Sequence, residues 1–165
     1  MGGWLSDPPA LNSNWSGPQP IPSEWAGNTE SAIVYAVDAE PQGIADLRGN
    51  FGVANGIFVW VNGQFRFGAL APLGAEPREY SDIPLGGLPP GINYIQILRE
   101  DHGGATGYTV EIGEADAVSA RCFPGGIALG DEGPPGYYND KLGTALDGRN
   151  PTAVSTGSTD AGSCL

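Results

Sequence analysis

Basic residues are scarce in this sequence, and histidine and cysteine are scarcer still. The 165 residues include 7 Lys and Arg against 19 Asp and Glu, which gives a formal net charge of −12. Binding to nucleic acid or to an anionic membrane needs a basic surface, so this charge argues against both partners. With 1 His and 2 Cys, the chain also lacks the ligands of a usual zinc site. The acidic surface instead favours solubility, and Ca²⁺ is the one cofactor that its carboxylates would attract.

Long apolar runs are missing as well. No stretch reaches the length of a transmembrane helix, so membrane insertion is not expected, and no segment has a sustained helical period. The opening residues, "MGGWLSDPPA", have neither the basic nor the apolar region of a signal peptide. We therefore expect either a cytosolic protein or a mature or engineered chain that begins at a new Met.

Turn-forming residues, in contrast, are abundant. The chain has 27 Gly and 15 Pro, and its hydrophobic residues, 40% of the total, fall in short clusters between them. Turn signals recur about every 8–12 residues, which is typical of an all-β sandwich or barrel. We therefore predict a single antiparallel β-sandwich with extended N- and C-terminal arms.

The chain divides into three predicted parts: an extended arm (1–29), the sandwich (30–123) and a loop-rich tail packed on the sandwich (124–165). The arm is expected to be anchored by Trp4, Trp15 and Trp25. Strands are expected at 31–39, 44–53, 57–61, 64–67, 79–88, 92–100, 106–112 and 117–123. The strand 79–88 contains Pro84, which cannot donate to a ladder, so we expect it at a sheet edge.

The strongest local pattern is "IFVWVNGQFRF" (57–67), in which Asn62-Gly63 predicts a type I′ hairpin. A two-residue turn sets the register. The predicted pairs are Val61 with Gln64, Trp60 with Phe65, Val59 with Arg66 and Phe58 with Phe67. In this register Phe58, Trp60, Phe65 and Phe67 share one face, and we predict that all four lie in the core.

The run from 52 to 112 resembles a known bacterial domain, most specifically in "NGIFVWVNG", "FGALAP" and "ILREDHGGATGY". It looks like the extracellular β-sandwich domain of proteins that often carry a PEP-CTERM sorting tail, and it is similar in shape to galactose-binding-like jelly rolls. The resemblance covers roughly residues 23–113 and implies a secreted, non-catalytic module with a jelly-roll fold. Two departures limit what is carried over. Ala54 stands where such domains often have Asp, and the chain ends in "GSTDAGSCL" without the sorting tail.

The stretch "LREDHGGATGY" (98–108) holds the only histidine, and three roles are open for it. Glu100, Asp101 and His102 would form an acid/base site if they converged, or would hold Ca²⁺ or a ligand through their polar atoms. The third role is structural. Residues 100–105 would then connect a β-hairpin between 92–99 and 106–112, with the glycines supplying positive φ. We favour this structural role.

Other candidate site residues are more scattered. In galactose-binding-like domains a structural Ca²⁺ often lies at one end of the sandwich, and Glu30 and Glu111 are the corresponding candidates here. Sugar binding uses flat aromatic side chains, for which Trp25, Tyr80, Tyr137 and Tyr138 are the candidates, although such residues also anchor arms to a sandwich.

These observations favour a non-catalytic extracellular module that binds carbohydrate or another surface polymer. An alternative is a structural subunit that self-associates through its terminal arms, for example by adding a strand to a neighbour's sheet edge. A hydrolase is a weaker alternative, because no nucleophile motif such as G-x-S-x-G is present.

We predict a disulfide between Cys122 and Cys164, because a thiol near the end of a Gly/Ser/Thr-rich tail otherwise has no packing role. Two free thiols or an intermolecular bridge are the alternatives. Closing such a loop would stabilise the fold by about 4 kcal/mol in the chain-entropy model. Thiol labelling and mass spectrometry of unreduced protein from an oxidising compartment should find neither cysteine labelled, whereas two labelled thiols would contradict the prediction.

Overall fold

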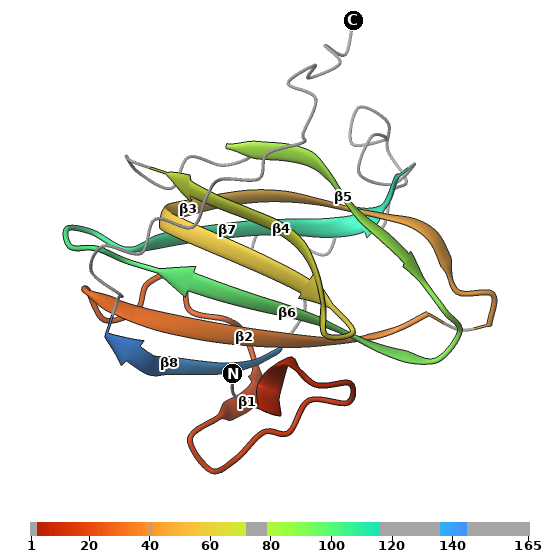
Figure 1. The fold of residues 1–165 in the computed structure, drawn as a ribbon, viewed down its shortest axis with the longest axis horizontal. Coiled ribbons are helices and arrows are strands. Elements are labelled where there is room, and N and C mark those ends of the chain that lie inside the picture. The colour runs from red at the N-terminus through yellow and green to blue at the C-terminus, as the bar shows by residue number, and fades with distance from the viewer. Residues whose placement is uncertain (1–2, 40, 72–78, 116–135, 145–165) are drawn as a thin grey trace, which may run out of the picture.

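The computed structural model describes residues 3–39, 41–71, 79–115 and 136–144. These residues form an antiparallel β-sandwich, as the sequence predicts (Figure 1). The elements are η1 (Gly3–Leu5), β1 (Ser16–Gln19), β2 (Thr29–Asp38), β3 (Ile44–Val61), β4 (Gln64–Ala71), β5 (Tyr80–Leu88), β6 (Ile92–Glu100), β7 (Gly107–Glu114) and β8 (Gly136–Thr144). No helix in these ranges is long and apolar enough to cross a membrane.

The two sheets share one strand. Sheet A has the order β1-β8-β2-β6-β3-β4, and in sheet B β3 lies between β5 and β7. The sequence predicts two strands, 44–53 and 57–61, where the structure has one continuous strand of 18 residues. Its first part pairs in sheet B and its second part in sheet A, with the crossing near Asn55 and Gly56. A Cβ on Gly56 would lie 2.8 Å from Leu70 Cδ2, so the Leu70 side chain would have to shift to admit a larger residue at this crossing.

The core lies between the sheets. From sheet A it receives every second residue of β2 and β6, among them Ile33, Tyr35, Ile95 and Ile97. From sheet B it receives the alternate residues of the first part of β3 and of β7, such as Phe51, Val53, Val110 and Ile112. The strands predicted at 31–39, 92–100 and 106–112 are therefore observed, and alternate residues of each face the core.

The predicted Asn62-Gly63 hairpin forms, with φ values of 48° and 74° that suit a type I′ turn. The first two predicted pairs are present, but the register then shifts. Arg66 is an extra residue in β4, so Phe67 lies opposite Val59. This β-bulge was not visible in the hydrophobic pattern.

The bulge changes which aromatic side chains reach the core. Phe67 is 3% exposed and packs in the core, but Phe58 and Trp60 are half-buried on the outer face and Phe65 is 49% exposed. The prediction of an aromatic core face is therefore wrong for these three residues. The inner face of this part of β3 is instead β-branched, with Ile57, Val59 and Val61 packed in the core.

The N-terminal arm covers part of the outer face of sheet A. Trp4 is 6% exposed, and its ring lies 5.8 Å from Trp15 and 5.9 Å from Trp60. The buried Gln96 side chain fastens the arm, because its Nε2 donates to the carbonyls of Trp4 (3.2 Å) and Ser6 (3.0 Å). The predicted anchoring of the arm by tryptophans is thus observed.

Residues 101–106 do not connect a β-hairpin. β6 pairs with β2 and β3 in sheet A, whereas β7 pairs with β3 in sheet B. The connection therefore crosses from one sheet to the other, and the predicted pairing of 92–99 with 106–112 is wrong. Alternation along two consecutive strands shows that each has a buried face, but it is satisfied equally by two strands that face each other across a core.

The segment expected to be a loop-rich tail contains a strand. β8 pairs with β2 and with the short arm strand β1, so a strand of the N-terminal arm and a strand of the predicted tail both join sheet A. Its sequence, "GYYNDKLGT", has little alternation and several turn formers, which explains why the pattern was missed. The predicted strand at 117–123, Cys122 and Cys164 all lie outside the described residues.

The packing of the arm predicts that Trp4→Ala lowers the free energy of unfolding by about 3 kcal/mol, as for other buried tryptophans. Ile92→Ala is the control, because Ile92 is 58% exposed and its loss should cost less than about 1 kcal/mol. Urea titration of both variants measures the difference. Equal losses would show that the arm contributes little to stability.

Candidate functional site

Four of the polar residues singled out in the sequence, Glu30, Glu100, Asp101 and His102, lie at one end of the sandwich, where the 101–106 connection meets residues 25–30. Asp101 N–H donates to the Thr29 carbonyl (3.3 Å), and Trp25 N–H donates to Thr106 Oγ1 (3.1 Å). We call this region the polar end. It comprises Asn28, Glu30, Asn55, Glu100, Asp101 and His102.

Asp101 is the most unusual member of the polar end. It is fully buried, yet it is a carboxylate. Its Oδ2 accepts hydrogen bonds from the N–H groups of Asn28 (2.6 Å) and Gly103 (3.1 Å). Its other oxygen, Oδ1, is buried and accepts no hydrogen bond. One half of this carboxylate is therefore held firmly by backbone, while the other half lacks a donor.

Glu100 and Glu30 add two more acids on the outer face of sheet A. They lie directly opposite each other in the β2–β6 register, so their side chains are on the same face. The Glu100 side chain is 6% exposed and lies over Gly56, where a Cβ would be 3.3 Å from its Oε2. Burial, and next the charge of Glu100, raise the pKa of Glu30.

His102 is the basic side chain that faces these acids. Its Nε2 lies 3.2 Å from Glu100 Oε1, and its side chain is 34% exposed. Its backbone N–H donates to Asn55 Oδ1 at 2.9 Å, which ties the connection to the crossing point of β3. The charge of a protonated His102 lowers the pKa of Glu30, against the larger effects of burial and Glu100.

Arg99 lies beneath the polar end, inside the sandwich. It is fully buried, and its guanidinium donates to the Pro22 carbonyl and to Ser31 Oγ, both at 2.7 Å. The guanidinium carbon is 4.4 Å from the Trp25 ring centroid and 4.9 Å from that of Tyr108, which are cation–π distances. Trp25 itself is 9% exposed, so it is a packing residue and not an open surface for stacking a sugar.

The other predicted aromatic site residues do not join the polar end. Tyr80 is half-buried, with its ring 5.4 Å from Phe67 at the side of the core. Tyr137 is half-buried against the outer-face cluster that holds Trp4. Tyr138 lies on β8 opposite Ile33 and Ser16 in the register. Packing therefore explains the positions of Tyr80 and Tyr137.

The two glutamates proposed to share Ca²⁺ are not brought together. Glu30 lies on the outer face of sheet A, whereas Glu111 alternates with the core residues Val110 and Ile112 and so lies on the outer face of sheet B. Within the described ranges, no group of three or more His, Cys, Asp or Glu is placed to hold a metal ion. A Ca²⁺ site there would have to use amide or carbonyl oxygens as well.

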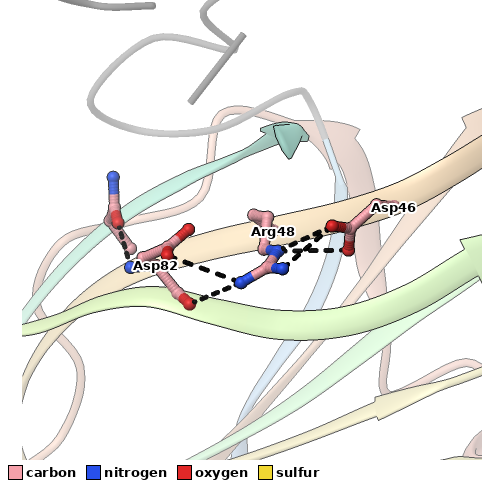
Figure 2. A network of polar contacts seen from close by, with 4 residues as sticks. Asp46, Arg48 and Asp82 are labelled. Atoms are coloured by element: carbon pink, nitrogen blue, oxygen red, sulfur yellow. Dashed lines mark hydrogen bonds and ion pairs between the residues drawn. The ribbon is translucent and has the colours of Figure 1, made fainter. Parts of the chain in front are cut away.

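Glu111 belongs to a second polar network, which the sequence did not predict. Asn50 donates to Glu111 Oε2 and accepts from the Asp82 N–H, both at 2.8 Å. Arg48 lies between Asp46 (2.9 Å) and the carboxylate of Asp82 (3.4 Å), as Figure 2 shows. The network links β3 to β5 and β7. Its Arg is directed at carboxylates of the same chain, so we assign it a structural role.

Comparisons with known proteins add little to this geometry. No family model matches the chain, and no curated protein matches it significantly. Among solved structures, a PA14 sugar-binding domain from an RTX adhesin is similar at 24% sequence identity with a TM-score of 0.37. The match covers 52% of this chain and 47% of that chain, so this chain spans about half the length of that neighbour.

The conformation of the connection predicts a strong dependence on Gly103, which has a φ of 106°. A side chain is strained in this region, and a Cβ would lie 3.1 Å from Asn28 Oδ1. Gly103→Val should therefore lower the free energy of unfolding by about 1–3 kcal/mol. His102→Ala should cost about 1 kcal/mol or less, as for one ordinary hydrogen bond.

Ala105→Val is the matched control, because Ala105 is exposed in the same connection and no positive φ is recorded for it. Thermal melts of the three variants provide the test. A Gly103→Val variant as stable as Ala105→Val would show that the connection adopts another conformation in solution.

Proposed function

We propose that this chain is a non-catalytic carbohydrate-binding module whose ligand is held at the polar end. The observation that carries the proposal is the unpartnered Oδ1 of Asp101. A buried acceptor without a donor costs about 1–3 kcal/mol, and a charged one costs more. A fold retains such a group at a loop-bearing end when something outside the chain completes it, and a sugar hydroxyl is a suitable donor.

The neighbours of Asp101 have the chemistry that carbohydrate recognition needs. Asn28 and Asn55 carry side-chain amides, which both donate and accept hydrogen bonds. His102 and Glu30 add a partly exposed donor and a partly exposed acceptor. Hydroxyl groups also donate and accept, so a polyhydroxylated ligand matches this mixed set better than an apolar or strongly anionic ligand.

Ca²⁺ is the cofactor that we propose for the same place. Asp101 Oδ1 would supply one carboxylate oxygen, and Asn28 Oδ1 and Asn55 Oδ1 would supply amide oxygens, which are donors that Ca²⁺ accepts. A bound Ca²⁺ would compensate the acidic charge and offer coordination positions to sugar hydroxyls. An extracellular location belongs to the same proposal, because surface polysaccharides lie outside the cell.

A hydrolase is less well supported. Glu100 Oε1 lies 3.2 Å from His102 Nε2, but no nucleophile motif such as G-x-S-x-G accompanies this pair. Self-association through the N-terminal arm is also less well supported, because Trp4 is already buried against the sandwich of the same chain.

The test is Asp101→Asn. The amide can still accept from the two backbone N–H groups while removing the uncompensated charge, so we expect this variant to be more stable than the parent without ligand, by about 1 kcal/mol. We expect Asp101→Asn to lose at least tenfold in affinity for carbohydrate, which is ~1.4 kcal/mol of binding free energy. A glycan array and calorimetry measure this affinity, each with and without 5 mM Ca²⁺.

Asp7→Asn is the matched control, because Asp7 is exposed in the arm and the substitution is the same. It should change neither stability nor binding. A parent that binds no glycan in either buffer would overturn the proposal. Equal binding by the parent and Asp101→Asn would show that the ligand is not held at the polar end.

A further inference from the structure

A second feature of sheet A lies next to the polar end and is not covered by the N-terminal arm. Trp60 is covered by Trp4, but Phe65, whose ring centroid is 5.6 Å from that of Trp60, is 49% exposed. Phe58, 6.3 Å from Trp60, is half-buried. We call Phe58 and Phe65 the aromatic platform. Phe65 is one of only two large hydrophobic side chains that are exposed in the described ranges.

Glycine allows these rings to lie close to the sheet. Gly68 is opposite Phe58 in the β3–β4 register. A Cβ on Gly68 would lie 2.8 Å from Phe58 Cδ1 and 3.1 Å from Phe65 Cζ, so both rings extend over this glycine. Rings that lie over a glycine cover the backbone on one side. Because both side chains are also partly exposed, the rings present apolar surface to solvent.

Two acids of the polar end, Glu30 and Glu100, lie on the same outer face of sheet A as the platform, in the row next to Phe58. Phe58 is opposite Leu98 on β6, and Gly56 is opposite Glu100. Leu98 and Glu100 are two residues apart, which is about 7 Å along a strand. Glu30 continues the acidic row on β2. Figure 1 shows β2, β6, β3 and β4 side by side in this sheet. A ligand longer than one sugar ring would reach both rows.

The charge of the surroundings selects the kind of ligand. The chain carries a net charge of −12, and Glu30 and Glu100 lie in the row next to the platform. Anionic polymers and anionic membranes would be repelled. A neutral sugar ring has one face of C–H groups that stacks on an aromatic ring, and a rim of hydroxyls that reaches nearby acceptors. The platform with its acidic border offers both kinds of contact.

We propose that Phe58 and Phe65 form a second sugar subsite, continuous with the polar end, and that the ligand is a neutral polysaccharide bound along sheet A. This inference rests on the proposed function, and it names the ligand class and the direction in which the ligand runs. One sugar unit contacts the polar end, and the next units stack on the platform.

The experiment compares the parent with Phe65→Ser, and with Phe58→Ser as the second platform variant. Ile92→Ser is the control, because Ile92 is the other exposed large hydrophobic residue and lies away from the platform. The probes are soluble mixed-linkage β-glucan, xyloglucan and galactomannan, the anionic polygalacturonate, and the monosaccharides glucose and galactose. Affinity gel electrophoresis and calorimetry measure binding, and thermal melts confirm folding.

We expect the parent to bind at least one neutral polysaccharide and not polygalacturonate. Phe65→Ser should weaken the polysaccharide at least tenfold and leave monosaccharide binding within twofold, while Ile92→Ser changes neither. If Phe58→Ser fails to fold, the result from Phe65→Ser alone decides.

Three outcomes would overturn the inference. Polysaccharide binding that Phe65→Ser leaves unchanged would refute the subsite while leaving the proposed function in place. A parent that binds no carbohydrate of any kind would refute both. A parent that sediments as a dimer and a Phe65→Ser variant that sediments as a monomer would show that the platform contacts a second copy of the chain.

Discussion

The fold depends on the passage of β3 from one sheet to the other. Four strands, β4, β5, β6 and β7, pair with β3, and its inward side chains line the core in both sheets. A register shift of one residue would turn all of these side chains outward, so the crossing is strongly fixed. Asn55 lies at this crossing and accepts from the His102 N–H. The same constraint that joins the sheets therefore also positions the connection that carries Asp101.

Most of the strands can be predicted from the sequence, because burial of alternate residues gives the hydrophobicity of a strand a period of two residues. The strands predicted at 31–39, 92–100 and 106–112 are present in the structure. The partner of each strand was harder to predict. Alternation reports that one face is buried, and it is silent on whether the next strand pairs beside it or packs across the core. The β6–β7 connection was therefore mistaken for a hairpin.

The aromatic residues near Asn62-Gly63 show a second limit. Residues 57–61 of this hairpin are apolar on both faces, so the hydrophobicity of β3 does not decide which face is inside. The bulge at Arg66 and the arm that covers Trp60 determine which face is inside. Neither feature can be predicted from alternation along one strand. At the polar end, Glu100, Asp101 and His102 were identified from their types, whereas Asn28 and Asn55 were missed. Only the meeting of 25–29 with 101–106 brings these amides together.

Buried polar side chains at the polar end and beneath the arm differ in how completely they are hydrogen-bonded. Gln96 is fully buried, and its amide is used on both sides, since Oε1 accepts from Gly63 N–H and Nε2 donates to the arm. Asp101 is equally buried but is satisfied on one oxygen only. Gln96 thus uses both ends of its amide, whereas one oxygen of Asp101 has no donor. In the proposed function, a ligand supplies the hydrogen-bond donor that Asp101 Oδ1 lacks. Folding already holds this carboxylate in place, so ligand binding would need little further loss of conformational entropy.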